Sequence, residues 1–179
     1  MFDLSGKTAL VTGASGGIGS KIVTALHGQG AKVILHGTRA DRLASLQESF
    51  GERAYCLPAD LSDREAVTKI METATELAGP VDILVNNVGQ SEPGGPASMT
   101  VTTWQSQIAL NLDAAFYTMQ AALTHMTAAQ AGSIINISSI AGQRYIGKPQ
   151  VGYAAAKAGL MQLTKTTAVI HAKDNVRIN

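Results

Sequence analysis

Tyr153 and Lys157 stand four residues apart at the start of a predicted helix, a spacing that puts both side chains on one helix face. A tyrosine hydroxyl ordinarily titrates near pH ~10 and is a poor acid or base at neutral pH. An ammonium group beside it stabilises the tyrosinate and brings that titration closer to neutral. Such a pair can therefore give a proton to a carbonyl oxygen or take one from an alcohol.

Two adjacent serines, Ser138 and Ser139, end the apolar run that precedes this helix. One of their hydroxyls can donate a hydrogen bond to an oxygen on which negative charge develops, and such a donor contributes about 10²–10³ in rate. The pattern Y-x-x-x-K alone is common by chance. Combined with serine at a strand end and a glycine-rich turn, it indicates a site for carbonyl or alcohol chemistry.

That glycine-rich turn, Thr12–Gly19, links the first apolar run to the first predicted helix. Glycine lets the backbone approach a pyrophosphate, and the N-terminus of the following helix offers free N–H groups and a positive dipole end. The common fingerprint G-x-G-x-x-G is not matched, but the segment fits both T-G-x-x-x-G-x-G and G-x-x-G-x-x-G. An ordinary glycine-rich loop is the alternative; the position after a first strand favours nucleotide binding.

The end of the second predicted strand distinguishes NAD from NADP binding. NAD-binding proteins place an acidic residue there for the ribose 2′-hydroxyl, whereas NADP-binding proteins place a cation there. Residues 35–39 read LHGTR and contain no acid. We expect Thr38 and Arg39 to hold a 2′-phosphate, which favours NADP(H) over NAD(H). In the alternative, Arg39 is a solvated residue that opens a helix.

Short apolar runs alternate with longer helical segments, which is typical of βαβ units. The sequence therefore predicts an α/β fold, a Rossmann-type doubly wound parallel sheet of strand order 3-2-1-4-5 with the start of strand 6. Ser62 is expected to cap the third helix, with Glu65 completing a capping box. We expect strands at 8–11, 32–35, 54–57, 81–85, 133–137 and 176–178, and helices at 18–28, 40–50, 62–78, 102–128 and 151–172.

The composition excludes several classes of protein. The 179 residues fit one domain, and 45% hydrophobic residues exclude a disordered chain. A net charge of +1 argues against nucleic-acid and membrane-surface partners. No secretory signal and no membrane span are expected. The single cysteine, Cys56, fits a reducing, cytoplasmic location, and the four scattered histidines predict no metal site.

The sequence resembles the short-chain dehydrogenase/reductase family, in its single-domain branch. The resemblance spans nearly the whole chain, and the first ninety residues are most similar to bacterial 3-oxoacyl-[acyl-carrier-protein] reductases. We therefore expect residues 1–179 to form one dinucleotide-binding domain that also carries the catalytic residues. The matching stretches are 12–19, 60–61, 86–89, 111, 136–142 and 153–157.

The resemblance implies a role for each matching residue. Tyr153 would be the general acid/base, Lys157 would favour its tyrosinate form and bind the nicotinamide ribose, and Ser139 would orient the substrate carbonyl. Asn111 would hold a water that extends the proton relay, and Asp60 would contact the adenine. The implied cofactor-binding residues are Gly13, Ser15, Gly17, Ile18, Gly19, Thr38, Arg39, Asp60, Leu61, Asn87, Gly89, Tyr153 and Lys157.

The resemblance thus implies an NADPH-dependent carbonyl reductase or alcohol dehydrogenase for a small-molecule or carrier-bound ketone, with a 3-oxoacyl thioester as the first candidate. The chain ends at Asn179 as a sixth strand begins, so we expect a C-terminally truncated chain in which the last part of the fold is missing. The alternative function is a nucleotide-binding fragment without turnover. Two features depart from the family. Val88 stands where members usually have Ala, and the gap from Ser139 to Tyr153 is one residue longer.

The long helix predicted at 102–128 has an unusual surface. Asp113 is the only Asp, Glu, Lys or Arg from residue 93 to 143. A helix so poor in charge is expected to be buried by a second subunit. In relatives this helix and the Tyr153 helix form a subunit interface, so the resemblance implies a homo-oligomer, a dimer or a tetramer. An apolar stripe expected in the core comprises Trp104, Ile108, Leu112, Phe116, Met119, Leu123 and Met126.

Overall fold

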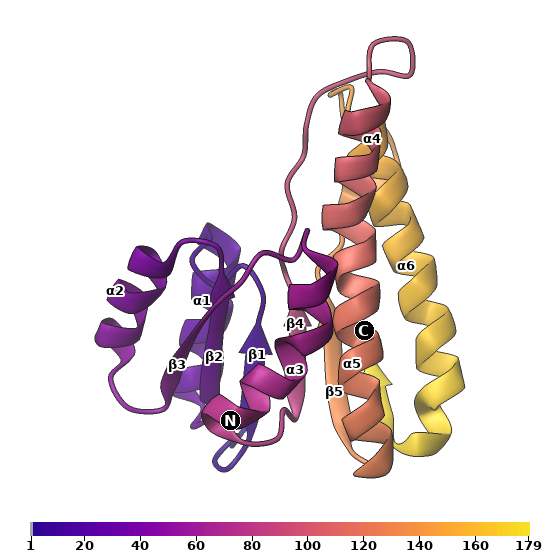
Figure 1. The fold of residues 1–179 in the computed structure, drawn as a ribbon. Coiled ribbons are helices and arrows are strands. Elements are labelled where there is room, and N and C mark those ends of the chain that lie inside the picture. Colours follow the sequence, from indigo (N-terminus) through magenta and orange to yellow (C-terminus); the bar gives the residue numbers. More distant parts are fainter. Residues whose placement is uncertain (1) are drawn as a thin grey trace.

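The computed structural model of the protein describes residues 2–179. Its centre is a parallel sheet whose strands lie in the order β3-β2-β1-β4-β5-β6, so the predicted doubly wound topology is confirmed (Figure 1). The sixth strand pairs with the start of the fifth, and the carbonyl of Asn179 accepts the N–H of Asn136 at 2.7 Å. The strands are β1 (Thr8–Val11), β2 (Lys32–Gly37), β3 (Ala54–Pro58), β4 (Ile83–Asn86), β5 (Gly132–Asn136) and β6 (Val176–Ile178).

Helices cover both faces of the sheet, as the unbroken apolar character of the strands requires. One core cluster packs α3, α5 and α6 on one face, around Leu10 and Ile34. The other packs α1 and α2 on the opposite face, around Val33 and Leu35. The helices are α1 (Gly17–Gly28), α2 (Ala40–Phe50), α3 (Arg64–Ala78), α4 (Val101–Ile108), α5 (Ala114–Ala128) and α6 (Val151–His171).

The start of α3 differs from the prediction. Asp63 is the N-cap, and its carboxylate accepts the N–H of Glu65 at 2.9 Å. The Ser62 hydroxyl donates instead to Asp60 at 2.8 Å. The predicted Ser62–Glu65 capping box was therefore wrong, because Asp60 binds both the N–H and the hydroxyl of Ser62 in a local turn.

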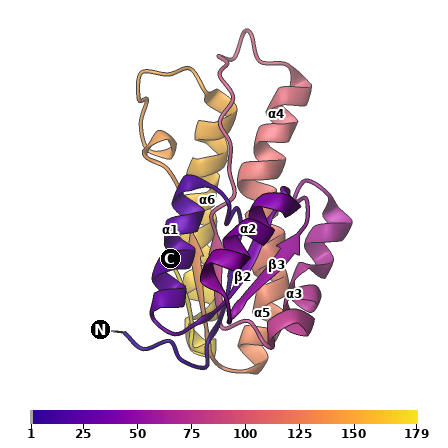
Figure 2. The same cartoon turned by 90° about the vertical axis from the view of Figure 1, so that its left-hand side faces the viewer.

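The predicted long helix consists of α4 and α5 joined by a π-helical segment, Ala109–Asp113. Figure 2 shows that α4 and the loop before α6 extend beyond the end of the sheet. Met119 and Met126 are buried in the core, but Trp104 and Phe116 are each 41% exposed. The assignment of those two aromatic residues to the core was wrong, because α4 extends beyond the sheet and Phe116 lines an open groove between α5 and α6.

Candidate active site

A cleft of about 430 Å³ opens at the carboxyl ends of β1, β2, β3 and β4. The structure brings together on its walls every predicted cofactor residue except Tyr153 and Lys157. These residues come from four separate strand ends, and only the parallel sheet places them side by side. The lining residues that were predicted are Gly13, Ser15, Gly17, Ile18, Gly19, Thr38, Arg39, Asp60, Leu61, Asn87 and Gly89.

The glycine-rich turn has the geometry that a pyrophosphate needs. Gly13 has a φ of +65°, which favours glycine, and a Cβ at Gly19 would collide with the carbonyl of Gly13. A Cβ at Gly17 would meet nothing within 4 Å, so the backbone there is open to the cleft. No side chain caps the N-terminus of α1, and its first turn carries no acid. The free N–H groups therefore fit an anion, as the diphosphate of a dinucleotide would be.

Thr12 joins the turn to the end of β4. Its hydroxyl oxygen accepts the N–H groups of Asn87 at 2.9 Å and Val88 at 3.0 Å. The Asn87 amide in turn donates to the carbonyls of Thr12 at 3.0 Å and Gly13 at 3.2 Å. Thr12 was not among the predicted site residues, although it opens the T-G-x-x-x-G-x-G pattern. It fixes two sides of the cleft to one another.

The end of β2 presents a free cation to the cleft. The guanidinium of Arg39 donates to the hydroxyl of Ser15 at 3.3 Å, and Thr38 beside it is exposed. No carboxylate pairs with Arg39 in the part of the chain that the structure describes. On the neighbouring wall, one carboxylate oxygen of Asp60 accepts from Ser62. The wall of the cleft at the end of β2 is therefore positively charged, whereas the wall at the end of β3 carries the carboxylate of Asp60.

Lys157 lies buried beside Tyr153. Its Nζ donates to the carbonyl of Ile137 at 2.8 Å and lies 5.8 Å from the centre of the Tyr153 ring. Burial lowers the pKa of Lys157 to about 8. The predicted tyrosine and lysine are therefore neighbours, on the first turns of α6.

Gly89 connects this pair to the cleft. A Cβ at Gly89 would lie 2.8 Å from Oδ1 of Asn111 and 3.3 Å from Nζ of Lys157. Glycine leaves that space open, at the point where the cleft wall meets the predicted catalytic residues. The Asn111 Nδ2 donates to the carbonyls of Gln90 and Gln107, both at 2.9 Å, and Oδ1 accepts the N–H of Gln90 at 3.1 Å. The side-chain donors of Asn111 are fully used by backbone groups.

The hydroxyl groups of Ser138 and Ser139 differ in their hydrogen bonds. The hydroxyl of Ser138 donates to the carbonyl of Lys157 at 3.0 Å. The Oγ of Ser139 accepts the N–H of Ala141 at 3.2 Å, and within residues 2–179 its hydrogen has no acceptor. Ser139 alone is free to donate to a further oxygen.

Several cleft residues were not predicted. His36, Val88 and Leu110 line it, and His36 is buried, with only 1% of its surface exposed. Burial lowers the pKa of His36 to about 4, against the weaker opposing effects of a hydrogen bond with the Ala59 backbone and of the Asp60 charge. The sequence signal that could have identified His36 was a histidine within an otherwise apolar strand.

Neither a metal-binding cluster nor a membrane-spanning helix occurs among the described residues. Within 2–179 no group of three or more His, Cys, Asp or Glu side chains is arranged to hold a metal ion. None of the helices in that range is long and apolar enough to cross a membrane.

Comparison with known proteins agrees with this architecture. The family model of the short chain dehydrogenases matches residues 7–179. Nodulation protein G of Rhizobium sp. (strain N33) is 42% identical, in an alignment that covers 100% of this chain and 73% of the relative. An uncharacterized oxidoreductase of Staphylococcus aureus (strain N315) is 35% identical over 98% of this chain and 76% of its own length.

Solved structures show the same likeness. The crystal structure of a putative short-chain alcohol dehydrogenase from Sinorhizobium meliloti 1021 superposes with a TM-score of 0.93 at 39% identity, over 99% of this chain and 71% of that one. With the fold and the nucleotide cleft, these matches establish that the chain belongs to the short-chain dehydrogenase/reductase family and is an NAD(P)-dependent oxidoreductase.

Proposed function

We propose that the protein is an NADPH-dependent carbonyl reductase, running reversibly as a secondary-alcohol dehydrogenase. The observation that carries this proposal is the junction at Gly89, where the cleft reaches Lys157 and Asn111. In the proposal residues 1–179 form one dinucleotide-binding domain that contains both the cofactor cleft and the catalytic group Asn111, Ser139, Tyr153 and Lys157.

The nicotinamide cofactor, when bound, supplies or accepts the hydride. The turn at Gly13–Gly19 and the N-terminus of α1 bind its pyrophosphate, and Asn87 and Gly89 line its path toward Lys157. Thr38 and Arg39 bind the 2′-phosphate, and the unpaired guanidinium beside Ser15 supports this preference for NADP(H). Ile18, Asp60 and Leu61 would enclose the remaining part of the cofactor.

The chain's own residues move the proton. Ser139 donates its free hydroxyl hydrogen to the substrate oxygen, which then develops negative charge. Tyr153 gives that oxygen a proton in reduction and takes it back in oxidation. Lys157 stabilises the tyrosinate and binds the nicotinamide ribose. Since the Asn111 side chain is committed to Gln90 and Gln107, its backbone would hold the relay water.

We propose a ketone as the substrate, with a 3-oxoacyl thioester on a carrier as the first candidate. The support for that acyl group is the resemblance of the first ninety residues to 3-oxoacyl-carrier reductases. We propose that Ile140, Tyr145 and Ile146, which are exposed on the segment between Ser139 and Tyr153, supply apolar contacts to the acyl group.

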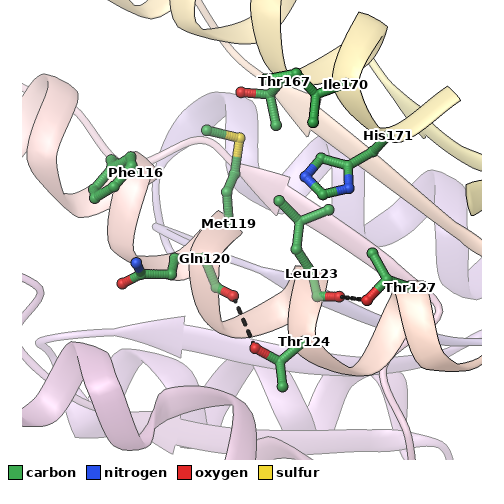
Figure 3. A pocket seen from close by; sticks show the side chains of 9 residues that line it. All are labelled: Phe116, Met119, Gln120, Leu123, Thr124, Thr127, Thr167, Ile170 and His171. Atoms are coloured by element: carbon green, nitrogen blue, oxygen red, sulfur yellow. Dashed lines mark hydrogen bonds between the residues drawn. The ribbon is translucent and has the colours of Figure 1, made fainter.

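We also propose a homo-oligomer, a dimer or a tetramer, formed through α5 and α6. A groove of about 380 Å³ between these helices is lined by Phe116, Met119, Leu123 and Ile170 (Figure 3). Ile170 is 54% exposed and Phe116 41%, so the groove forms part of an exposed apolar patch of the kind that marks an interaction surface. In light scattering, Ile170→Asp should lower the mass of the assembly; an unchanged mass would remove this face from the interface.

We also propose a cytoplasmic location, because the single cysteine suits a reducing compartment.

The test of the proposed function is consumption of NADPH with a panel of ketones that includes 3-oxoacyl thioesters. The wild-type chain should oxidise NADPH, and Tyr153→Phe should abolish turnover while leaving NADPH binding intact. Ordinary turnover in Tyr153→Phe would remove this tyrosine from the mechanism. Binding without turnover in the wild type would favour the alternative, a nucleotide-binding protein without reductase activity.

A further inference from the structure

A glutamine is the one buried residue of α4, a helix that the structure describes in full. Only 2% of the surface of Gln107 is exposed, whereas Trp104, one turn earlier, is 41% exposed. Burying an amide destabilises a fold unless its polar atoms find partners, so an apolar side chain would be the ordinary choice at this position. The buried amide of Gln107 therefore requires an explanation.

The side-chain oxygen of Gln107 holds the segment that follows β4. Its Oε1 accepts the N–H of Glu92 at 3.2 Å. Asn111, one turn further along, binds both backbone groups of Gln90 in the same segment, and its Nδ2 also donates to the backbone carbonyl of Gln107. Residues 90–92 do not belong to a strand, so these two side chains supply the partners that a sheet would otherwise give to their backbone.

The same segment reaches across to the residues that precede Tyr153. The Ser91 hydroxyl donates to Oε1 of Gln150 at 2.6 Å. The carbonyl of Gly94 accepts the N–H of Val151, the first residue of α6, at 3.1 Å. A displacement of the segment after β4 would therefore be transmitted to the start of α6.

The stem of Gln107 also supports the start of α6 directly. Helix α4 packs against α6 (Figure 1). A Cβ added at Gly152 would lie 3.0 Å from Cβ and 3.3 Å from Cγ of Gln107, so the two helices approach closely at this point. Gly152 directly precedes Tyr153. One buried side chain thus contacts both the segment after β4 and the first turn of α6.

We propose that Gln107 is a positioning residue for the proton transfer by Tyr153. It fixes residues 90–92 and the first turn of α6 to one another, which keeps the Tyr153 hydroxyl in place beside Ser139 and the substrate oxygen. This inference rests on the proposed function, because that function assigns the proton transfer to Tyr153. Gln107 does not line the cofactor cleft, so it acts through the tyrosine and not on the cofactor.

Three variants test the inference. Gln107→Met removes the acceptor for Glu92 and keeps an unbranched stem against Gly152, whereas Gln107→Glu keeps an acceptor at the same distance along the side chain. Gln105→Met is the matched control, because Gln105 is exposed on the same helix. The measurements are NADPH affinity and the steady-state reduction, in H₂O and in D₂O, of a ketone that the wild type accepts.

We expect Gln107→Met to lower kcat about 10–100-fold, since a small misplacement of a catalytic group has an effect of that size. The affinity for NADPH should not change. The solvent isotope effect on kcat should rise, because proton transfer from a misplaced tyrosine limits the rate more strongly. Gln107→Glu should recover most of the lost kcat, and Gln105→Met should behave as the wild type.

The isotope effect separates positioning from a merely structural role. A smaller fraction of folded protein would lower kcat without changing the isotope effect, and that result would overturn the inference. Hydrogen exchange tests the linkage without turnover. Gln107→Met should speed exchange in residues 90–94 and also in residues 150–153, to which the Gln107 amide makes no hydrogen bond. Unchanged exchange in residues 150–153 would overturn the linkage.

The outcomes also separate this inference from the proposed function. A wild type that binds NADPH but reduces no ketone would overturn the proposed function and the role of Gln107 with it. A wild type that reduces ketones, with the same kcat and isotope effect in Gln107→Met, would overturn the role of Gln107 alone. If Gln107→Met does not fold, Gln107→Asn takes its place, because its amide is one carbon short of Glu92. The same loss is expected there, and an ordinary kcat would overturn the inference.

Discussion

Replacing Lys157 with methionine should make the protein more stable at neutral pH. The lysine is buried, and its ammonium donates to the carbonyl of Ile137 at 2.8 Å. No carboxylate in the described part of the chain lies within ion-pair distance of it. A buried charge with so little compensation destabilises the fold, and methionine keeps most of the apolar stem.

The magnitude follows from the pKa of Lys157. Burial lowers this pKa from 10.5 to about 8. At about 1.4 kcal/mol for each pH unit, the difference corresponds to about 3 kcal/mol of unfavourable free energy when the group is charged. The substitution also removes the hydrogen bond to Ile137, which contributes about 1 kcal/mol. The net gain in the free energy of unfolding at pH 7 should therefore be about 1–3 kcal/mol.

The pH dependence gives the same effect a second signature. Between about pH 8 and 10.5 the folded protein has released the Lys157 proton while the unfolded chain still holds it. The unfolded state then binds more protons, so the stability of the wild type should rise with pH across this window. Below about pH 8 both states are protonated and the contribution of Lys157 is flat.

Urea unfolding at several pH values, followed by circular dichroism, measures both effects. Lys157→Met should be more stable at pH 7 and should lack the rise that the wild type shows at alkaline pH. Lys165→Met, an exposed lysine on the same helix, is the matched control and should change neither. A Lys157→Met protein that is less stable than the wild type, with the same pH dependence, would refute the reasoning.

Three further predictions concern the site. Arg39→Ala should weaken NADPH binding about 10–100-fold and NADH binding little, since it removes a charged hydrogen bond to the 2′-phosphate; equal losses in a titration of both cofactors would sink the preference. Ser139→Ala should lower kcat about 10²–10³-fold whereas Ser138→Ala should not, because only the Ser139 hydroxyl is free to donate; steady-state rates that fall equally would contradict this. His36 should make the fold acid-sensitive: below pH 6.5 only the unfolded chain gains its proton until about pH 4, so about 3 kcal/mol is lost over this window. His36→Leu should flatten that part of the urea-unfolding profile against pH, and an unchanged profile would show that another group titrates.

The sequence predicts the fold and most of the cleft because both depend on local pattern. The strand–helix alternation specifies a parallel sheet, and a parallel sheet gathers its strand ends at one edge. Gly13 and Arg39 could therefore be placed at one edge of the sheet from the order of strands and helices, whereas Asp60 and Asn87 were assigned through the resemblance to the family. The spacing of Tyr153 and Lys157 needed only a helix.

The remaining details depend on partners far apart in the sequence or on local competition that a pattern does not reveal. Ser62 looked like a helix cap, but the nearby carboxylate of Asp60 takes its hydroxyl. The choice between Ser138 and Ser139 depends on the carbonyl of Lys157, a contact made across the fold. His36 looked like a scattered histidine because a sequence does not show that a residue at a strand end is buried beside the cleft.

A crystal structure of the complex with NADP⁺ tests the central claim most directly. It should show the 2′-phosphate on Arg39, the adenine against Asp60, and the nicotinamide ribose within hydrogen-bond distance of Lys157, with the cofactor passing Gly89. A cofactor bound outside the cleft, or one whose nicotinamide lies at the Arg39 end, would contradict the account.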